Sequence, residues 1–169
     1  MKRAFPLLLF VALLLASCGY HLGGLRRASM KHLNTYCVEM FANKTLYPNV
    51  AMQITTAVGD GLQRDGTYRL ASPEKCDFRV TGVVTSVQAS GLLTNAGDTY
   101  LSSEIGLRVY VTCTVINNRT GKIIYSRQVS ATGSFFNDDT GNVQTARESA
   151  LSYATRQAAE LIVQSLTLP

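Results

Sequence analysis

The sequence predicts an α/β (α+β) two-layer sandwich: a four-stranded mixed sheet with two helices on one face, in the order βαβββα. Three observations carry this prediction. Residues 105–116 alternate between apolar and polar side chains, the period of a half-buried strand. Residues 49–66 and the C-terminal stretch instead repeat apolar residues every three or four positions, as amphipathic helices do. A sheet with one polar face needs a helical layer on its other face only.

Four segments have the composition of strands. Residues 36–41 and 78–88 are rich in β-branched and aromatic residues, and residues 105–116 and 122–132 flank a turn at 117–121. One side of the last two strands is polar, and we expect it to form a polar sheet face from Tyr110, Thr112, Thr114, Ser126, Gln128 and Ser130.

Both helices have recognisable ends. Asn49, after Pro48, is the expected N-cap of the first helix, and Gly66 can close it. Asn142 or Thr145 caps the second helix. Its apolar stripe contains several alanines, which permit a close approach to the sheet: Val143, Ala146, Ala150, Ala154, Ala158, Leu161, Ile162 and Leu166.

The N-terminus has the features of a secretory signal. Lys2 and Arg3 precede an apolar run of about 13 residues, roughly 20 Å as a helix and too short to cross a hydrocarbon core of about 30 Å. The following Leu15-Ala16-Ser17-Cys18 resembles the lipobox of bacterial lipoproteins, although an ordinary secretory signal remains the alternative. The expected division is a lipoprotein signal peptide at 1–17, a lipidated tether at 18–34 and one domain at 35–169.

Lipidation of Cys18 would anchor the chain permanently, since a lipoprotein cysteine carries three acyl chains and one alone holds only marginally. Gly19, rather than Asp, follows the cysteine, which favours the outer membrane and a periplasm-facing domain. Arg26 and Arg27 lie within reach of lipid headgroups, or belong to a solvated linker. Without the signal, 14 basic residues face 11 acidic ones and form no long Lys/Arg runs, so no nucleic-acid partner is expected.

Three further cysteines remain. Cys113 alternates with the valines of a strand and is expected as a small core residue. Cys37 and Cys76 could form a disulfide, which an oxidising periplasm permits, or remain buried free thiols.

Two stretches offer apolar side chains to a partner. The 15-residue loop at 89–103 carries Leu92, Leu93 and Tyr100, and Phe135-Phe136 precedes the last helix. The loop side chains either contact a partner or tuck under the fold. Of the two phenylalanines, we expect one in the core and the other at a partner.

Catalytic motifs are missing from the sequence. His21 and His32 lie far in sequence from any strand-end carboxylate or serine, and no nucleophile elbow, P-loop or zinc-protease motif occurs. We expect no enzymatic activity, no cofactor and no metal site.

A set of short motifs resembles the LPS-assembly lipoprotein (LptE) family. These are Cys18-Gly19-Tyr20-His21-Leu22, Phe41-Ala42-Asn43-Lys44-Thr45, Ser134-Phe135-Phe136-Asn137 and Ala158-Ala159-Glu160-Leu161-Ile162, in order along the mature chain. The resemblance implies a plug inside the outer-membrane barrel LptD that helps the barrel to fold and binds lipopolysaccharide. The polar sheet face around Tyr110 agrees with it, because a barrel lumen is polar.

The sequence departs from the family at the expected lipopolysaccharide contacts. Residues 89–103 and 128–141 contain no Lys or Arg, which leaves Arg108, Lys122 and Arg127 as the remaining candidates. The alternative function is a periplasm-facing auxiliary or structural lipoprotein of another envelope transport system.

The lipobox yields the first testable prediction. Mass spectrometry of the mature protein should find an acylated cysteine, Cys18, at the N-terminus. Cys18→Ala should leave the domain folded but unanchored. A mature chain that begins at another residue and carries no acyl group would refute the prediction that Cys18 is lipidated.

Overall fold

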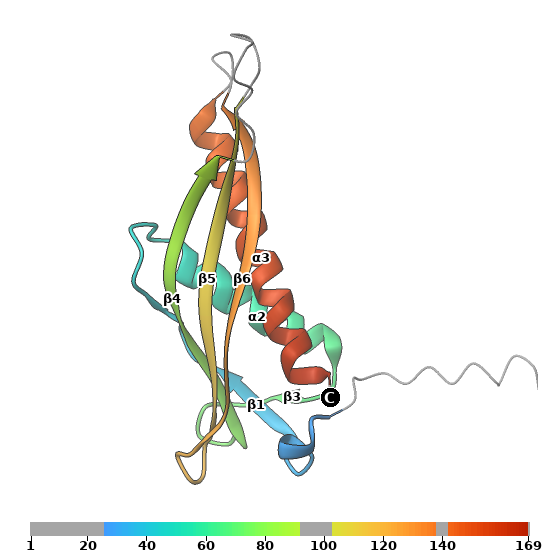
Figure 1. Ribbon diagram of the computed structural model, residues 1–169. Coiled ribbons are helices and arrows are strands. Elements are labelled where there is room, and N and C mark those ends of the chain that lie inside the picture. The colour runs from blue at the N-terminus through green and yellow to red at the C-terminus, as the bar shows by residue number, and fades with distance from the viewer. Residues whose placement is uncertain (1–25, 92–102, 138–141, 169) are drawn as a thin grey trace, which may run out of the picture.

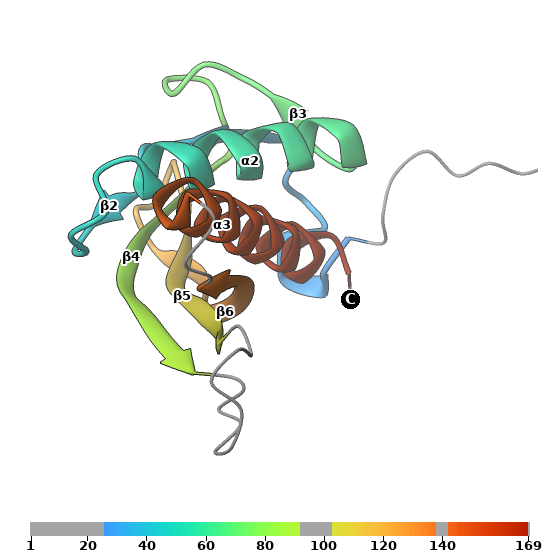
Figure 2. The same ribbon diagram turned by 90° about the horizontal axis from the view of Figure 1, so that it is seen from above.

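A twisted sheet forms one layer of the computed structural model, and two helices cover one of its faces (Figures 1 and 2). The structure describes residues 26–91, 103–137 and 142–168. In chain order the elements are η1 (Ala28–Met30), β1 (Thr35–Val38), β2 (Ala42–Asn43), α2 (Val50–Asp65), β3 (Arg69–Leu70), β4 (Phe78–Gly91), β5 (Ser103–Asn117), β6 (Ile123–Asn137) and α3 (Val143–Thr167).

The sheet is mixed, as predicted. Its order is β3-β1-β4-β5-β6, with β2 also paired to β4. The pairings of β1 with β3 and β4, and of β2 with β4, are parallel, whereas β4, β5 and β6 are antiparallel. The predicted class is therefore confirmed, but the prediction of four strands is wrong, because the described part of the sheet has six. The missed strands, β2 and β3, have two residues each, too few to show a periodic pattern.

Strands β4, β5 and β6 are longer than the sequence pattern predicts. They have 14, 15 and 15 residues and form a long three-stranded ribbon, seen in Figure 1. Backbone pairing between neighbouring strands continues past the segments in which apolar and polar residues alternate. The sequence placed Phe135 and Phe136 in a connection before the last helix. In the structure they belong to β6 and pair with Ile105 and Glu104 of β5.

Helix α3 lies directly on the helix-covered face of β5 and β6, with α2 beside it (Figure 2). The predicted alanines Ala150, Ala154 and Ala158 are buried, and a Cβ on Gly133 of β6 would collide with the carbonyl oxygen of Ala150. Leu161 departs from the predicted stripe and is 40% exposed. Helix α3 also buries Thr155, whose hydroxyl donates to the Leu151 carbonyl at 2.8 Å.

Helix ends mostly follow the predictions. Gly66 ends α2 with φ of 72°, and its N–H donates to the Leu62 carbonyl at 3.2 Å. Asn142, rather than Thr145, caps α3, since its side chain accepts from the Thr145 N–H at 3.3 Å. Asn49 is the N-cap residue of α2, as predicted, and its carbonyl accepts from the Gln53 N–H at 3.0 Å, but its side chain makes no capping hydrogen bond.

The cysteines divide as one pair and one free thiol in the described chain. Cys37 of β1 and Cys76, just before β4, form a disulfide with a Cα–Cα distance of 5.7 Å, the first of the two alternatives. Cys113 is free and 1% exposed, and burial raises the pKa of its thiol to about 12. Its predicted role as a core residue is confirmed.

Residues 26–34, expected as part of the tether, pack on the domain. Met30 of η1 is 0% exposed and Leu33 is 4% exposed, and both belong to the core cluster. The packed domain therefore begins upstream of residue 35. The predicted signal peptide and Cys18 lie outside the described residues. Among the described helices, none is long and apolar enough to cross a membrane.

Asp77 holds the start of β1 against the start of β4. Its Oδ2 accepts from the backbone N–H groups of Asn34 and Thr35 at 2.9 and 3.0 Å, and from the Thr35 hydroxyl at 3.0 Å. The hydrogen bond from Asn34, followed by those from Thr35 and the charge of Arg119, keeps the carboxyl pKa below its ordinary value of 3.8.

Removing this carboxylate should destabilise the domain in a pH-dependent way. Because the pKa is depressed in the folded state, the contribution is complete above the unfolded value and is lost as the pH falls. Asp77→Ala should lower the free energy of unfolding by about 1.5–3 kcal/mol at pH 7. Urea titrations should show this difference shrinking below about pH 4. A difference independent of pH would contradict the assignment.

The contact between Gly133 and α3 gives a second stability prediction. Gly133→Ala should cost about 1–3 kcal/mol, because the added methyl group meets the backbone of Ala150. The matched control is Gly59→Ala in α2, where an added Cβ meets nothing within 4 Å. Since alanine favours helix over glycine, this control should stabilise by about 0.5–1 kcal/mol in the same thermal unfolding assay. Equal effects at the two positions would show that the helix does not approach so closely.

Candidate functional site

The face of the β4–β6 ribbon that points away from the helices is uncovered by any described element and faces the viewer in Figure 1. On β5 and β6 it carries the side chains predicted from the sequence, which form directly opposed pairs. The pairs are Tyr110 with Ser130, Thr112 with Gln128 and Thr114 with Ser126. We call these six residues, together with Arg108 and its partner Thr132, the open face.

The open face is polar and carries one charged residue. Arg108 Nε donates to the Thr132 hydroxyl at 3.1 Å, and the hydroxyls of Thr114 and Ser126 lie 3.4 Å apart. Ser126, Gln128 and Ser130 are exposed, whereas Tyr110 and Thr112 are half-buried among their neighbours. Such a surface can exchange hydrogen bonds with another polar surface at little desolvation cost, because it has few charges to strip of water.

The two phenylalanines predicted to contact a partner differ in exposure. Phe135 is 5% exposed and belongs to the core, whereas Phe136 is 56% exposed and points to the same side as the open face. The expectation that one ring is buried and the other accessible is confirmed, and Phe135 is not available to a partner. Leu92, Leu93 and Tyr100 lie outside the described residues.

The three basic candidates for lipopolysaccharide do not converge. Arg108 is on the open face, Lys122 is in the turn between β5 and β6, and Arg127 pairs with Cys113 on the helix-covered side. The structure therefore provides no single site that holds all three side chains. Sequence spacing could not reveal this, since 108 and 127 lie on different strands and the pleat places them on opposite faces.

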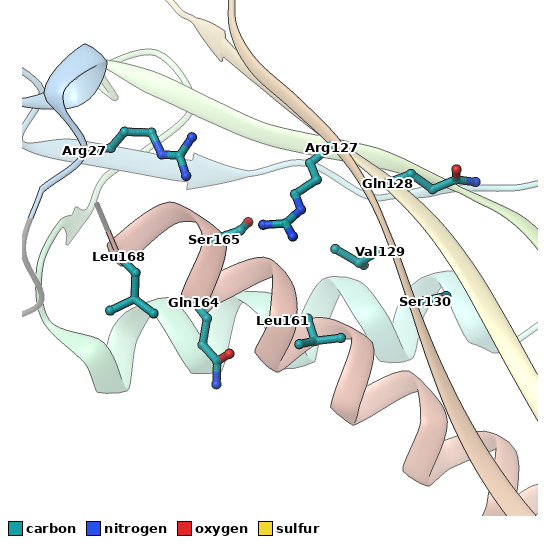
Figure 3. Close-up of a pocket in the computed structure, with 9 residues that line it drawn as sticks. All are labelled: Arg27, Arg127, Gln128, Val129, Ser130, Leu161, Gln164, Ser165 and Leu168. Atoms are coloured by element: carbon teal, nitrogen blue, oxygen red, sulfur yellow. The ribbon is translucent and has the colours of Figure 1, made fainter.

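Arg127 instead lines a hollow of about 380 Å³ between the edge of β6 and the C-terminal end of α3 (Figure 3). Arg27 borders it from the N-terminal segment, with its guanidinium 4.5 Å from the centroid of the Tyr125 ring. Strand β6 forms one wall of the hollow, and the C-terminal end of α3 forms the other with Leu161, Gln164, Ser165 and Leu168. Among the described residues, none that lines this hollow is acidic. Its residues come from three distant parts of the chain, so no local sequence pattern reveals it.

The described part of the chain offers few residues that could act in catalysis or bind a metal ion. No three His, Cys, Asp or Glu residues there come together in a way that could hold a metal ion. The one described histidine, His32, is exposed and borders a shallow hollow with Asp77 and Arg119.

Comparison with known proteins identifies the fold. No family model and no curated protein matches the chain. Among solved structures it is similar to a Xanthomonas campestris protein of the DUF330 family, with a TM-score of 0.57 and 9% identity, covering 88% of each chain. It is also similar to a protein described as a candidate neuraminyllactose-binding haemagglutinin homologue from Helicobacter pylori (TM-score 0.52, 11% identity, covering 85% of this chain and 89% of that one).

A third similar structure is a protein described as a candidate lipoprotein from Caulobacter crescentus. Its TM-score is 0.51 at 12% identity, covering 76% of this chain and 88% of that one. At such identities these likenesses show a common fold and leave the function to be argued from the chain itself.

Proposed function

We propose that the chain is an outer-membrane lipoprotein that plugs an LptD-type β-barrel, helps it to assemble and takes part in lipopolysaccharide transport to the cell surface. The proposed role is structural rather than catalytic and requires no cofactor. The ordered motifs from Cys18-Gly19-Tyr20-His21-Leu22 to Ala158-Ala159-Glu160-Leu161-Ile162 support the family assignment. The fold shared with a candidate lipoprotein from Caulobacter crescentus supports the broader assignment to lipoproteins.

The open face is the observation that carries the plug hypothesis. The interior wall of an outer-membrane barrel is polar, so a protein inside it needs a polar, hydrogen-bonding exterior. Tyr110, Thr112 and Gln128 provide such a surface on a rigid sheet, with Arg108 as its one charge. An extended surface with few charges avoids burying unpaired ions against the barrel.

Lipopolysaccharide is proposed as the transported cargo of the complex, with a limited direct role for this chain. Arg108 is the candidate that lies on the surface facing the barrel, and its guanidinium already donates to Thr132. Lys122 and Arg127 lie elsewhere and would not act with it at one phosphate. The proposed barrel contacts are the half-buried Tyr110 and the exposed Phe136, which lie on the same side of the ribbon.

A substitution at the centre of the open face tests the plug directly. Thr112→Lys places a charge against the barrel wall and should reduce recovery of the barrel, by affinity purification in mild detergent, at least about tenfold. The isolated domain should lose no more than about 1 kcal/mol, because the lysine can extend into water.

The matched control is Thr56→Lys, an exposed position on α2 that makes the same change of residue and charge. It should recover the barrel as wild type does. Equal recovery with the two variants would remove the open face from the interface. A wild-type protein that retains another envelope complex, and no barrel, would favour an auxiliary lipoprotein of a different transport system.

A further inference from the structure

Three separate segments of the chain meet at one end of the domain, the lower end in Figure 1. We call residues 26–34, 64–77 and 117–127 the basic end. Arg26 connects the first two, donating to the Asn34 side chain at 2.8 Å and to the Thr67 carbonyl at 3.3 Å. Asp77 connects all three, because it accepts from Asn34 and lies 3.8 Å from Arg119.

The charge of the domain is concentrated at this end. Its three segments contain nine Lys and Arg residues and three Asp and Glu residues. The other described residues contain five of each sign, so they have no formal excess. The basic side chains are Arg26, Arg27, Lys31, Arg64, Arg69, Lys75, Arg119, Lys122 and Arg127.

Most of these cations have no carboxylate partner within the described structure. The described ion pair at this end is the one between Arg119 and Asp77. Arg26 and Arg27 lie over the rings of Tyr68 and Tyr125, and Arg27 Nε is buried without a hydrogen-bond partner among the described residues. Lys31, Arg69 and Lys122 are exposed. The end therefore presents positive charge that nothing described in the domain neutralises.

The position of the anchor gives this charge a partner. Cys18 precedes Arg26 by eight residues, which span at most about 27 Å when fully extended. Helix α3, with 25 residues, is about 37 Å long and runs from the opposite end of the ribbon toward the basic end. A chain anchored at Cys18 therefore keeps its basic end, and not the opposite end, next to the membrane.

We propose that the basic end is a docking surface for the phosphate headgroups of anionic phospholipids in the leaflet that holds the anchor. This proposal rests on the lipid anchoring in the proposed function. Basic residues spread over three segments match a plane of many phosphates better than a single bound anion. The hollow between Arg27 and Arg127, whose described lining residues include no acidic one, admits one headgroup into that surface.

Vesicle binding tests the surface without the anchor. The buried core extends from Met30 to Leu166, so the mature chain carrying Cys18→Ser should retain its fold. It should sediment with vesicles of phosphatidylcholine containing one-third phosphatidylglycerol, and not with phosphatidylcholine alone. Added salt should release it. K31Q/R69Q/K122Q should weaken binding roughly fivefold for each charge, on the order of 100-fold in all.

The control K44Q/R147Q/R156Q removes the same net charge from exposed positions outside the basic end and should bind as wild type does. In the lipidated protein on the same vesicles, a water-soluble amine reagent should modify Lys31 and Lys122 more slowly than Lys44. Three results would overturn the proposal: equal losses with both triple variants, binding that ignores phosphatidylglycerol, or release by inorganic phosphate at constant ionic strength.

The same variants separate this proposal from the plug. Because the open face is unchanged in K31Q/R69Q/K122Q, this variant should still recover the barrel. Recovery of the barrel without selective vesicle binding would refute the docking surface alone. Selective vesicle binding without any barrel would refute the plug and leave the docking surface standing.

Discussion

The close contact between α3 and strand β6 determines the remaining architecture. At Gly133 the backbone of Ala150 comes so near that no side chain fits between them, and buried alanines continue this contact along the helix. Where the helix comes this close to the sheet, it presents the small side chains of Ala150, Ala154 and Ala158. Larger side chains, such as Ile162 of α3, Ile54 of α2 and Phe78 of β4, fill the core around this contact. One face of the ribbon is thereby fully occupied, while the other has no described element on it and remains available.

The difference between the covered and the uncovered face explains how a sheet with so many polar residues can be stable. Cross-strand partners such as Thr112 and Gln128 contribute little to the core, because the odd-numbered residues between them and the helices, such as Val109, are fully buried. The outward side chains are consequently free of packing constraints and can be selected for contact with a partner. Arg108 alone brings a charge to the open face.

Periodicity predicted the class, both long helices and the polar face, because those features depend on local sequence and on which side chains share a face. Gly66 and Asn142 were recognisable as helix ends for the same reason. Features that depend on contacts between distant segments were missed. The two-residue strands exist only through pairing with β1 and β4, and residues 26–34 look like a linker until Met30 is seen in the core. The basic end was equally hidden, since its charges are dispersed along the sequence and a modest net charge conceals their common location.

The two proposed surfaces are geometrically compatible. Strands β4, β5 and β6 run along the long axis of the domain, from the basic end toward the opposite end (Figure 1). If the basic end lies at the level of the headgroups, these strands run along the membrane normal and the open face stands parallel to it. The wall of a membrane-spanning barrel has that same direction, because its axis follows the normal. Charge at the basic end would then set the orientation in which the polar side chains around Thr112 meet the wall, and the short chain between Cys18 and Arg26 would limit how far the domain can stray from it.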